Sequence, residues 1–376
     1  MNGIYLDYAA TTPMDPEVIE VVAKAMQEDF GNASSLYKIG RASKQKVEGV
    51  RRLIAETLNA KVDDIIITSG GTESNDSAIL QTVNRLRDKG NHLISTEAEH
   101  SSVYQTMRHL ERQGMEVTYL PFDEEGHIDF DALKAAIRPD TILVSIMAGN
   151  NEVGSLQDIQ AIGDLLHERD IFFHTDTVQT YLNVPLDVES LHIDALSMSA
   201  HKIYGPKGIG FMYYRNATAD YAPYVKGGNQ ENKKRAGTEA LPLIIGMGKA
   251  IEKQYNNMAG HQAHLNEMRD YFLAGAKERG IELHINGPQT SELAHVLNVY
   301  WPNHQSDQVL IKLDLRDAYL SAGSACTAGS LEPSRVLVSM YGEDSPRIAQ
   351  SLRISFGEPT TTEEIDQILD IFESIK

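Results

Sequence analysis

Short apolar runs alternate with amphipathic helical stretches along the first two thirds of the chain. The runs are rich in branched or aromatic residues and mostly lack a regular polar alternation, which is typical of strands buried on both faces. Helical patterns lie between several of the runs, so the sequence predicts a largely parallel sheet covered by helices. The predicted strands span residues 64–68, 92–95, 116–120, 141–145, 171–174, 195–199 and 209–214.

After Glu239 the pattern changes and predicts a second, smaller α+β unit. The chain ends in a helix that Thr361 and Glu364 open as a capping box. We expect a large domain over residues 12–257, a small C-terminal domain over 258–376, and an N-terminal arm, 1–11, that packs near the small domain. The part of the chain after Glu239 contains helical stretches at 241–255 and 260–278, strand-like segments at 294–300 and 351–355, and a glycine- and serine-rich loop at 321–330.

Composition agrees with this two-domain interpretation. The 376 residues are 41% hydrophobic and 23% charged, which is ordinary for a globular protein of more than one domain. No apolar stretch approaches the roughly 20 residues that cross a bilayer, and the N-terminus does not resemble a secretory signal. We therefore expect a cytoplasmic protein with no membrane partner.

The charge and the cysteine count each exclude a class of function. A net charge of −19 repels phosphate backbones, so we expect no direct nucleic-acid binding. The single cysteine, Cys326, permits neither an internal disulfide nor a thiolate zinc cage within one chain. A lone cysteine is either an inert core residue or a reactive thiol, and its surroundings must decide between the two.

The segment Ser69–Asn75 (Ser-Gly-Gly-Thr-Glu-Ser-Asn) follows a predicted strand and precedes a helical stretch. A glycine such as Gly71 lets the backbone approach a ligand closely, and N–H groups at a helix start attract an anion. Thr72 adds a hydroxyl donor. The pattern favours a phosphate site, and the alternative interpretation is a plain glycine turn with a helix cap.

Lys202 stands just beyond a predicted buried strand and is followed by glycines. An amine in such a place loses hydration, its pKa falls, and its neutral form can make a Schiff base. Ser199 and His201 can donate hydrogen bonds to a phosphate. The alternative is an ordinary surface lysine at a strand end, but the Ser-x-His-Lys pattern favours the reactive lysine.

Asp176 falls at the end of another predicted strand, with Gln179 shortly after it. A carboxylate there can pair with the protonated ring nitrogen of pyridoxal phosphate, and Gln179 could reach the ring hydroxyl. The alternative is a helix cap, because loops between strands and helices often carry aspartate. Only the presence of Lys202 makes the pairing the better interpretation.

His100, in the segment Glu97–Ser102, could stack on an aromatic ring and shuttle protons, or it could be structural. Other histidines, such as His261 and His264, have no comparable context, and their spacing alone does not make a metal site. We therefore expect no metal.

Cys326 lies among alanine, serine and glycine, which bury little apolar area. Such a loop suits a thiol that must reach a substrate and then an external acceptor, whereas the alternative is an inert packed cysteine.

Arg353 lies inside a predicted strand and needs a partner. Two partners are possible: a substrate carboxylate that Arg353 holds by two hydrogen bonds, or an acidic side chain in a buried ion pair.

Taken together, these motifs resemble the cysteine desulfurases of the NifS/IscS kind, in the class V branch of the fold type I pyridoxal-phosphate enzymes. The resemblance runs from Tyr5–Pro13 through Phe30–Ser35 to Thr362–Glu364, so it covers almost the whole chain. It implies an α/β fold type I transferase with a mostly parallel mixed sheet in a large domain and a smaller α+β C-terminal domain.

The resemblance also implies a role for each candidate. Lys202 would hold the cofactor as a Schiff base, Asp176 would pair with the ring nitrogen, and His100 would stack on the ring. Cys326 would take sulfur from L-cysteine as a persulfide and leave L-alanine. Of the others, Gln179 would meet the ring hydroxyl, Gly71, Thr72, Ser199 and His201 would hold the phosphate, Thr238 would reach the neighbouring subunit's phosphate site, and Asn151 and Arg353 would bind the substrate carboxylate.

These roles imply partners. Thr238 requires a homodimer with shared sites, and the persulfide requires an acceptor protein, such as a scaffold or thiolase-type partner, in iron–sulfur cluster assembly or tRNA thiolation. Two alternatives stay open: a class V aminotransferase that lacks the thiol chemistry, and a catalytically silent scaffold. The chain departs from the family pattern where Gly71 replaces the usual alanine, which we expect to be harmless, at Tyr37, and at Met147–Gly149.

Overall fold

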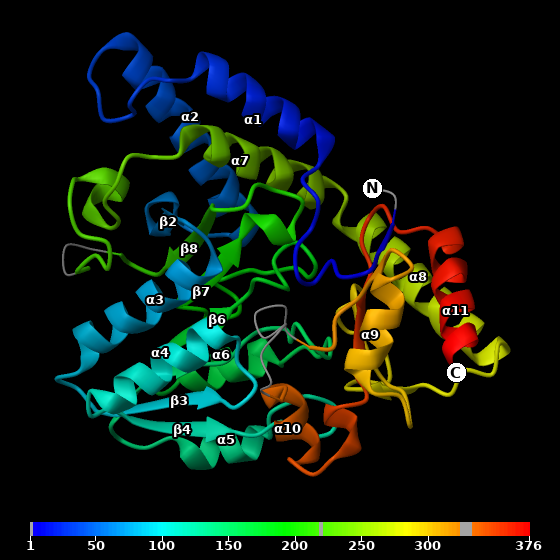
Figure 1. The fold of residues 1–376 in the computed structure, drawn as a ribbon. Coiled ribbons are helices and arrows are strands. Elements are labelled where there is room, and N and C mark those ends of the chain that lie inside the picture. Colours follow the sequence, from blue (N-terminus) through cyan, green and yellow to red (C-terminus); the bar gives the residue numbers. More distant parts are fainter. Residues whose placement is uncertain (1–2, 218–220, 324–332) are drawn as a thin grey trace.

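A seven-stranded sheet lies at the centre of the computed structural model, which describes residues 3–217, 221–323 and 333–376. Its strand order is β2-β8-β7-β6-β5-β3-β4 (Figure 1). The pairings from β7 to β4 are parallel and β8 is antiparallel to both of its neighbours, so the prediction of a mostly parallel sheet is confirmed. The strands are β2 (Ile65–Thr68), β3 (His92–Thr96), β4 (Glu116–Leu120), β5 (Thr141–Ser145), β6 (Phe172–Asp176), β7 (Ala195–Ser199) and β8 (Gly210–Tyr214).

Helices cover both faces of this sheet, because successive side chains of a strand point to opposite sides. Ile66 of β2 packs in one apolar cluster with residues of α3 and α4, whereas Ile65 and Ile67 pack with residues of α1, α2, α6 and α7. Burial on both faces explains why most of the strands lack a polar alternation. The helices are α1 (Pro16–Glu28), α2 (Lys38–Leu58), α3 (Gly71–Leu86), α4 (Ser101–Arg112), α5 (Phe130–Ala136), α6 (Ile159–His167) and α7 (Leu241–Asn256).

Strand β4 is the exception to the predicted burial on both faces. Glu116 is exposed and the next residues of the strand are only half-buried. β4 ends the strand order and pairs with β3 alone. β2 ends the order on the other side but is buried throughout, because Glu231 covers its free edge and accepts a hydrogen bond from the Ile67 N–H. The apolar run correctly predicted a strand here, but not its place at the margin of the sheet.

A second sheet, β12-β10-β9, carries its own apolar core beside the large sheet (Figure 1). Phe272 of α8, Ile354 of β12 and Phe372 of α11 belong to this core, together with Ile4 and Leu6 from the N-terminal arm. The boundary between residues 257 and 258 stays a prediction. The elements are β1 (Ile4–Tyr5), α8 (Met258–Glu278), β9 (His284–Asn286), β10 (Val296–Tyr300), α9 (Ser306–Asp314), β11 (Ala318–Tyr319), α10 (Arg335–Tyr341), β12 (Ser351–Ser355) and α11 (Thr362–Ile375).

A buried ion pair fixes an unusual stretch of backbone next to the large sheet. Glu231, Asn232 and Lys233 all have left-handed φ angles, of 48°, 54° and 69°, which cost roughly 1–2 kcal/mol for each residue that is not glycine. The Glu231 carboxylate accepts hydrogen bonds from Arg51 at 2.6 and 2.9 Å and from the Ile67 N–H at 2.9 Å. These buried contacts hold the strained turn in place.

We predict that Glu231→Gln strongly destabilises the protein, because the buried Arg51 guanidinium would lose its ionic partner. Breaking one side of a buried pair should lower the free energy of unfolding by roughly 3–5 kcal/mol, measurable by urea denaturation. Asp131→Asn is the matched control, since Asp131 pairs with Lys134 at the exposed surface and should contribute less than about 1 kcal/mol. Equal effects of the two variants would contradict the prediction.

Candidate active site

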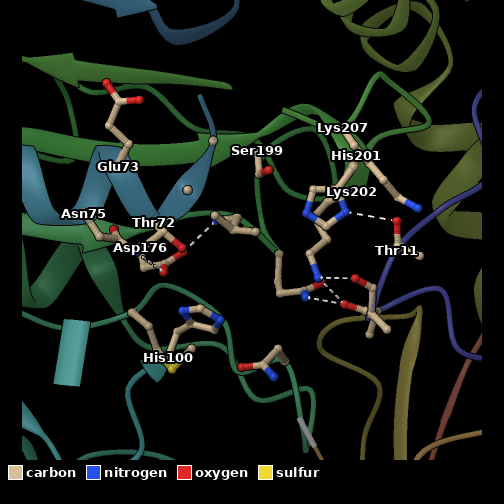
Figure 2. A pocket seen from close by; sticks show the side chains of 18 of the residues that line it. Thr11, Thr72, Glu73, Asn75, His100, Asp176, Ser199, His201, Lys202 and Lys207 are labelled. Carbon is tan, nitrogen blue, oxygen red and sulfur yellow. Dashed lines mark hydrogen bonds between the residues drawn. The ribbon is translucent and has the colours of Figure 1, made fainter. Parts of the chain in front are cut away.

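The candidate active site is a pocket of about 400 Å³ where the carboxyl ends of β6 and β7 meet the N-termini of α3 and α4 (Figure 2). The N-terminal arm contributes Ala9, Ala10 and Thr11 to the pocket wall. The pocket brings together most of the residues predicted for the site, namely Gly71, Thr72, His100, Asn151, Asp176, Gln179, Ser199, His201, Lys202 and Arg353.

Two further predicted residues are Cys326 and Thr238. Cys326 lies outside the described residues. Thr238 is exposed at the surface, while Arg235 of the same segment pairs with Glu73 in the first turn of α3 at 2.8 and 3.1 Å. Burial alone would raise the pKa of Glu73, but hydrogen bonds from Arg235 and Ser69 lower it. The pair holds the segment that carries Thr238 against the start of α3.

Lys202 ends a short turn of 3-10 helix, Ala200–Lys202, that continues from β7. Its Nζ atom donates to the carbonyl oxygens of Ala9 at 2.5 Å and Ala10 at 2.9 Å. The amine therefore points into the pocket and towards the N-terminal arm (Figure 2). The sequence predicted Lys202 but not these acceptors, since a backbone carbonyl has no side-chain signature.

The start of α3 has the features of an anion site. Gly70, with φ of 145°, precedes the helix, and no side chain caps the helix there, so the first N–H groups of α3 are available to a ligand. The Ser199 hydroxyl lies 3.3 Å from where a Cβ at Gly70 would stand. A Cβ at Gly71 would come within 2.8 Å of Val178 Cγ2, so alanine at position 71 requires Val178 to move, and glycine fits this chain.

Asp176 ends β6 and is almost completely buried. Its Oδ2 atom accepts a hydrogen bond from Asn75 Nδ2 at 2.7 Å, and its Oδ1 atom accepts one from the Val178 N–H at 2.9 Å. The second bond resembles the helix-cap interaction that was the alternative interpretation, but the carboxylate also lines the pocket. Asn75 was not predicted as a site residue, although it follows Gly71 by one helical turn on α3.

His100 is the N-cap residue of α4 and lies on the same side of the pocket as Asp176 (Figure 2). Its Nδ1 atom accepts from the Ser102 N–H at 3.2 Å and lies 2.8 Å from Ser102 Oγ. The Ser102 hydroxyl also accepts from Asn75 Nδ2 at 2.9 Å. Ser102 is a second residue that the sequence did not indicate.

Two further histidines near the pocket are held neutral. Burial, assisted by Lys202 and Lys207, lowers the pKa of His201 to about 4, and its Nδ1 atom lies 3.0 Å from the Thr11 hydroxyl. His295 lies behind the pocket, where burial and nearby cationic groups lower its pKa to about 3. Its Nε2 atom is 2.9 Å from Gln179 Oε1, while Gln179 Nε2 donates to the Ala9 carbonyl at 3.0 Å.

Arg353 of β12 is 1% exposed and forms the ion pair that was one of its two predicted roles. Its guanidinium donates to Asp7 Oδ1 at 2.7 Å and to the Asn151 carbonyl at 2.9 Å. The Arg353 Nε atom has no hydrogen-bond partner within the described ranges. Because this N–H is buried and Arg353 lines the pocket, the arginine keeps a donor for an anionic ligand.

A cavity of about 30 Å³ adjoins the pocket and is lined by His100, Asn151 and Pro333–Arg335. Pro333, at which the described part of the chain resumes after residues 324–332, therefore lies next to His100 and Asn151. Ser334 donates to Glu152 Oε2 at 2.5 Å and fixes this point.

Comparison with known proteins identifies the family of the chain. The family model "Aminotransferase class-V" matches residues 4–368. A cysteine desulfurase IscS of Dictyoglomus turgidum is 45% identical over 99% of this chain and 94% of its own length. A putative cysteine desulfurase IscS 1 of Bacillus subtilis is 43% identical over 97% of this chain and 96% of its own.

Two solved structures have a similar fold. A NifS-like protein superposes with a TM-score of 0.91 at 31% identity and covers 99% of both chains. A structure described as SspA in complex with cysteine has a TM-score of 0.82 at 34% identity, covering 95% of this chain and 99% of that one.

His295 should make the stability of the protein depend on pH. Its pKa is about 3 in the folded chain against an ordinary value of 6.5, so between these values the unfolded chain binds a proton that the folded chain does not. Stability should therefore fall as the pH drops from 6.5 towards 3. In His295→Gln, urea unfolding from pH 6.5 to 4 should show a slope shallower by up to about 1.4 kcal/mol per pH unit, and an unchanged slope would contradict a neutral, buried His295.

Proposed function

The chain belongs to the class-V aminotransferase family and, within it, to the cysteine desulfurases of the NifS/IscS kind, and from this premise we propose how its residues divide the work of the reaction. As a cysteine desulfurase, the protein is an enzyme that takes the sulfur from L-cysteine and leaves L-alanine. The observation that carries the assignment of residues is the single pocket into which Lys202, Asp176 and the uncapped start of α3 all open.

These three features fit pyridoxal 5′-phosphate. The start of α3, with Gly71, Thr72, Ser199 and His201, would hold the phosphate, because its N–H groups have no side-chain cap and Gly70 and Gly71 keep the backbone open. Lys202 would hold the cofactor as a Schiff base, and Asp176 would pair with its ring nitrogen. Once bound, the cofactor supplies an electron sink for the charge that develops at the substrate Cα.

The protein's own groups move the proton and orient the ring. The carbonyl oxygens of Ala9 and Ala10 accept hydrogen bonds from Lys202 Nζ and so fix its position. In its neutral form this amine would take the proton from the substrate Cα. His100 would lie against the ring. Gln179 is fixed by His295 and the Ala9 carbonyl, which leaves one N–H of its amide for the ring hydroxyl.

Arg353 and Asn151 would bind the carboxylate of L-cysteine. The unpartnered Arg353 Nε–H supports this role, and both residues line the pocket. Asp7 pairs with the arginine, and a carboxylate ligand would compete with it.

Cys326 would be the nucleophile. Its thiolate would attack the substrate sulfur, so that a sulfur–sulfur bond forms while the carbon–sulfur bond breaks, and protonation of the remaining carbon gives alanine. The return of the chain at Pro333–Arg335 beside His100 and Asn151 supports this role. A protein acceptor, in iron–sulfur cluster assembly or tRNA thiolation, would then receive the persulfide.

The enzyme would act as a homodimer in which Thr238 reaches the partner subunit's phosphate site. Large apolar side chains around α1 and the start of α2 support a subunit interface, since Leu36 is 88%, Phe30 79% and Tyr37 59% exposed.

A cytoplasmic location stays a prediction. Among residues 3–217, 221–323 and 333–376, the structure contains no helix whose length and hydrophobicity would let it span a membrane.

Cys326→Ala separates the cofactor chemistry from the sulfur chemistry. This variant should keep the absorbance of the bound cofactor and of its substrate complex, but sulfur release and alanine formation should fall to the level of a control without enzyme. Lys202→Ala should lose the absorbance of the Schiff base and at least about 10²-fold of the activity. Normal desulfuration by Cys326→Ala would refute its role, and keto-acid formation in place of sulfide would indicate an aminotransferase.

The apolar surface around α2 should hold the dimer together. Leu36→Asp places a charge at the most exposed of these side chains and should convert the dimer to a monomer in light scattering after size exclusion. Leu315→Asp is the matched control, because Leu315 is 79% exposed but follows α9, far from α1 and α2 (Figure 1). A dimer that survives Leu36→Asp, or that Leu315→Asp also dissociates, would place the interface elsewhere.

A further inference from the structure

A continuous chain of hydrogen bonds connects Asp176 to His100 beneath the pocket. Asn75 Nδ2 donates to Asp176 Oδ2 at 2.7 Å and to Ser102 Oγ at 2.9 Å. Ser102 Oγ lies 2.8 Å from His100 Nδ1, and the Ser102 N–H donates to the same nitrogen at 3.2 Å. Asn75 and Ser102 are 1% and 8% exposed, so water cannot readily substitute for these partners.

The orientation of the Asn75 amide follows from chemistry. If the amide were turned over, its oxygen would lie 2.7 Å from the Asp176 carboxylate, and two acceptors would face each other. The observed orientation leaves Asn75 Oδ1 buried without a partner within the described residues. This unsatisfied oxygen indicates that donation to Asp176 decides the orientation.

The remaining donors and acceptors then have one arrangement. Both N–H groups of the Asn75 amide are used, so Ser102 Oγ is an acceptor on that side and its own hydrogen is directed to His100 Nδ1. The backbone N–H of Ser102 points at the same nitrogen. With two donors directed at Nδ1, the proton of a neutral imidazole must be on Nε2.

The position of His100 also opposes a positive charge. His100 is the N-cap of α4, where the helix dipole disfavours a cation, and a proton on Nδ1 would face the Ser102 N–H. Of the buried carboxyls nearby, Glu99 has its pKa raised by burial to about 8, so it is largely protonated at pH 7, and burial also raises the pKa of Glu152.

We propose that Asn75 and Ser102 are positioning residues that hold His100 as a neutral imidazole with its proton on Nε2. In this state His100 is a hydrogen-bond donor towards a ligand in the pocket rather than a group that carries protons back and forth. A neutral imidazole in such a role stabilises negative charge without giving up its proton. This inference rests on the proposed function only in placing His100 against the cofactor and substrate.

The tautomer can be read directly by nitrogen NMR of protein labelled with ¹⁵N-histidine. His100→Gln identifies the two His100 resonances by their loss. In the cofactor-loaded wild-type enzyme at pH 7, we expect Nε2 to carry the proton and Nδ1 to be unprotonated. A protonated Nδ1, alone or together with a protonated Nε2, would overturn the proposal.

Kinetics then test the positioning role. Ser102→Ala removes one donor to His100 and should lower kcat by about tenfold with little change in KM, and Ser102→Thr, which keeps the hydroxyl, should recover most of that loss. Ser101→Ala, on the neighbouring residue, should leave both constants unchanged. Equal effects of Ser102→Ala and Ser102→Thr would show that the hydroxyl does not act through His100.

The two hypotheses fail in distinguishable ways. If the enzyme releases no sulfur from L-cysteine, the proposed function fails, but the His100 resonances still report the tautomer. If desulfuration is normal and Nδ1 carries the proton, only the role of Asn75 and Ser102 is wrong.

Discussion

Burial of the Arg353 guanidinium is the constraint on which the arrangement of this molecule most depends. A cation that is 1% exposed must find its partners inside the protein, and it finds them in Asp7 of the N-terminal arm and in the Asn151 carbonyl of the loop after β5. The arginine itself lies on β12 of the smaller sheet. One side chain therefore joins the arm, the smaller sheet and the edge of the large sheet at which the pocket opens.

The parallel sheet explains why the other pocket residues gather at the same edge. The carboxyl ends of parallel strands lie together, and two of these strands, β2 and β3, each lead to the start of a helix. Asp176 ends β6 and Lys202 follows β7, whereas Gly71 and His100 open α3 and α4. Anion-binding N–H groups and side chains at strand ends are thus brought together by topology, without long-range sequence signals.

This topology also explains how much could be predicted from the sequence. The strands could be predicted because burial on both faces removes polar residues from them. Lys202, Asp176 and the glycine turn could be predicted because they stand directly after such apolar runs. Asn75, Ser102 and His295 could not be predicted in this way, since each depends on at least one partner that is distant in sequence and that only folding brings within 3 Å. The carbonyls of Ala9 and Ala10, which hold Lys202, carry no residue-type signal at all.

The residues that sequence analysis missed share one physical task, which is to decide the direction of hydrogen bonds. His295 lies 2.9 Å from Gln179 Oε1, and since Gln179 Nε2 donates to a carbonyl, His295 must donate from its Nε2 atom. Ser102 and Asn75 impose the same tautomer on His100. In both places a neutral imidazole with a single orientation results from an amide whose own orientation is set by an oxygen: the Ala9 carbonyl for Gln179 and the Asp176 carboxylate for Asn75. The pocket residues set which groups can touch a ligand, and this second layer sets which atoms of those groups carry a proton when they do.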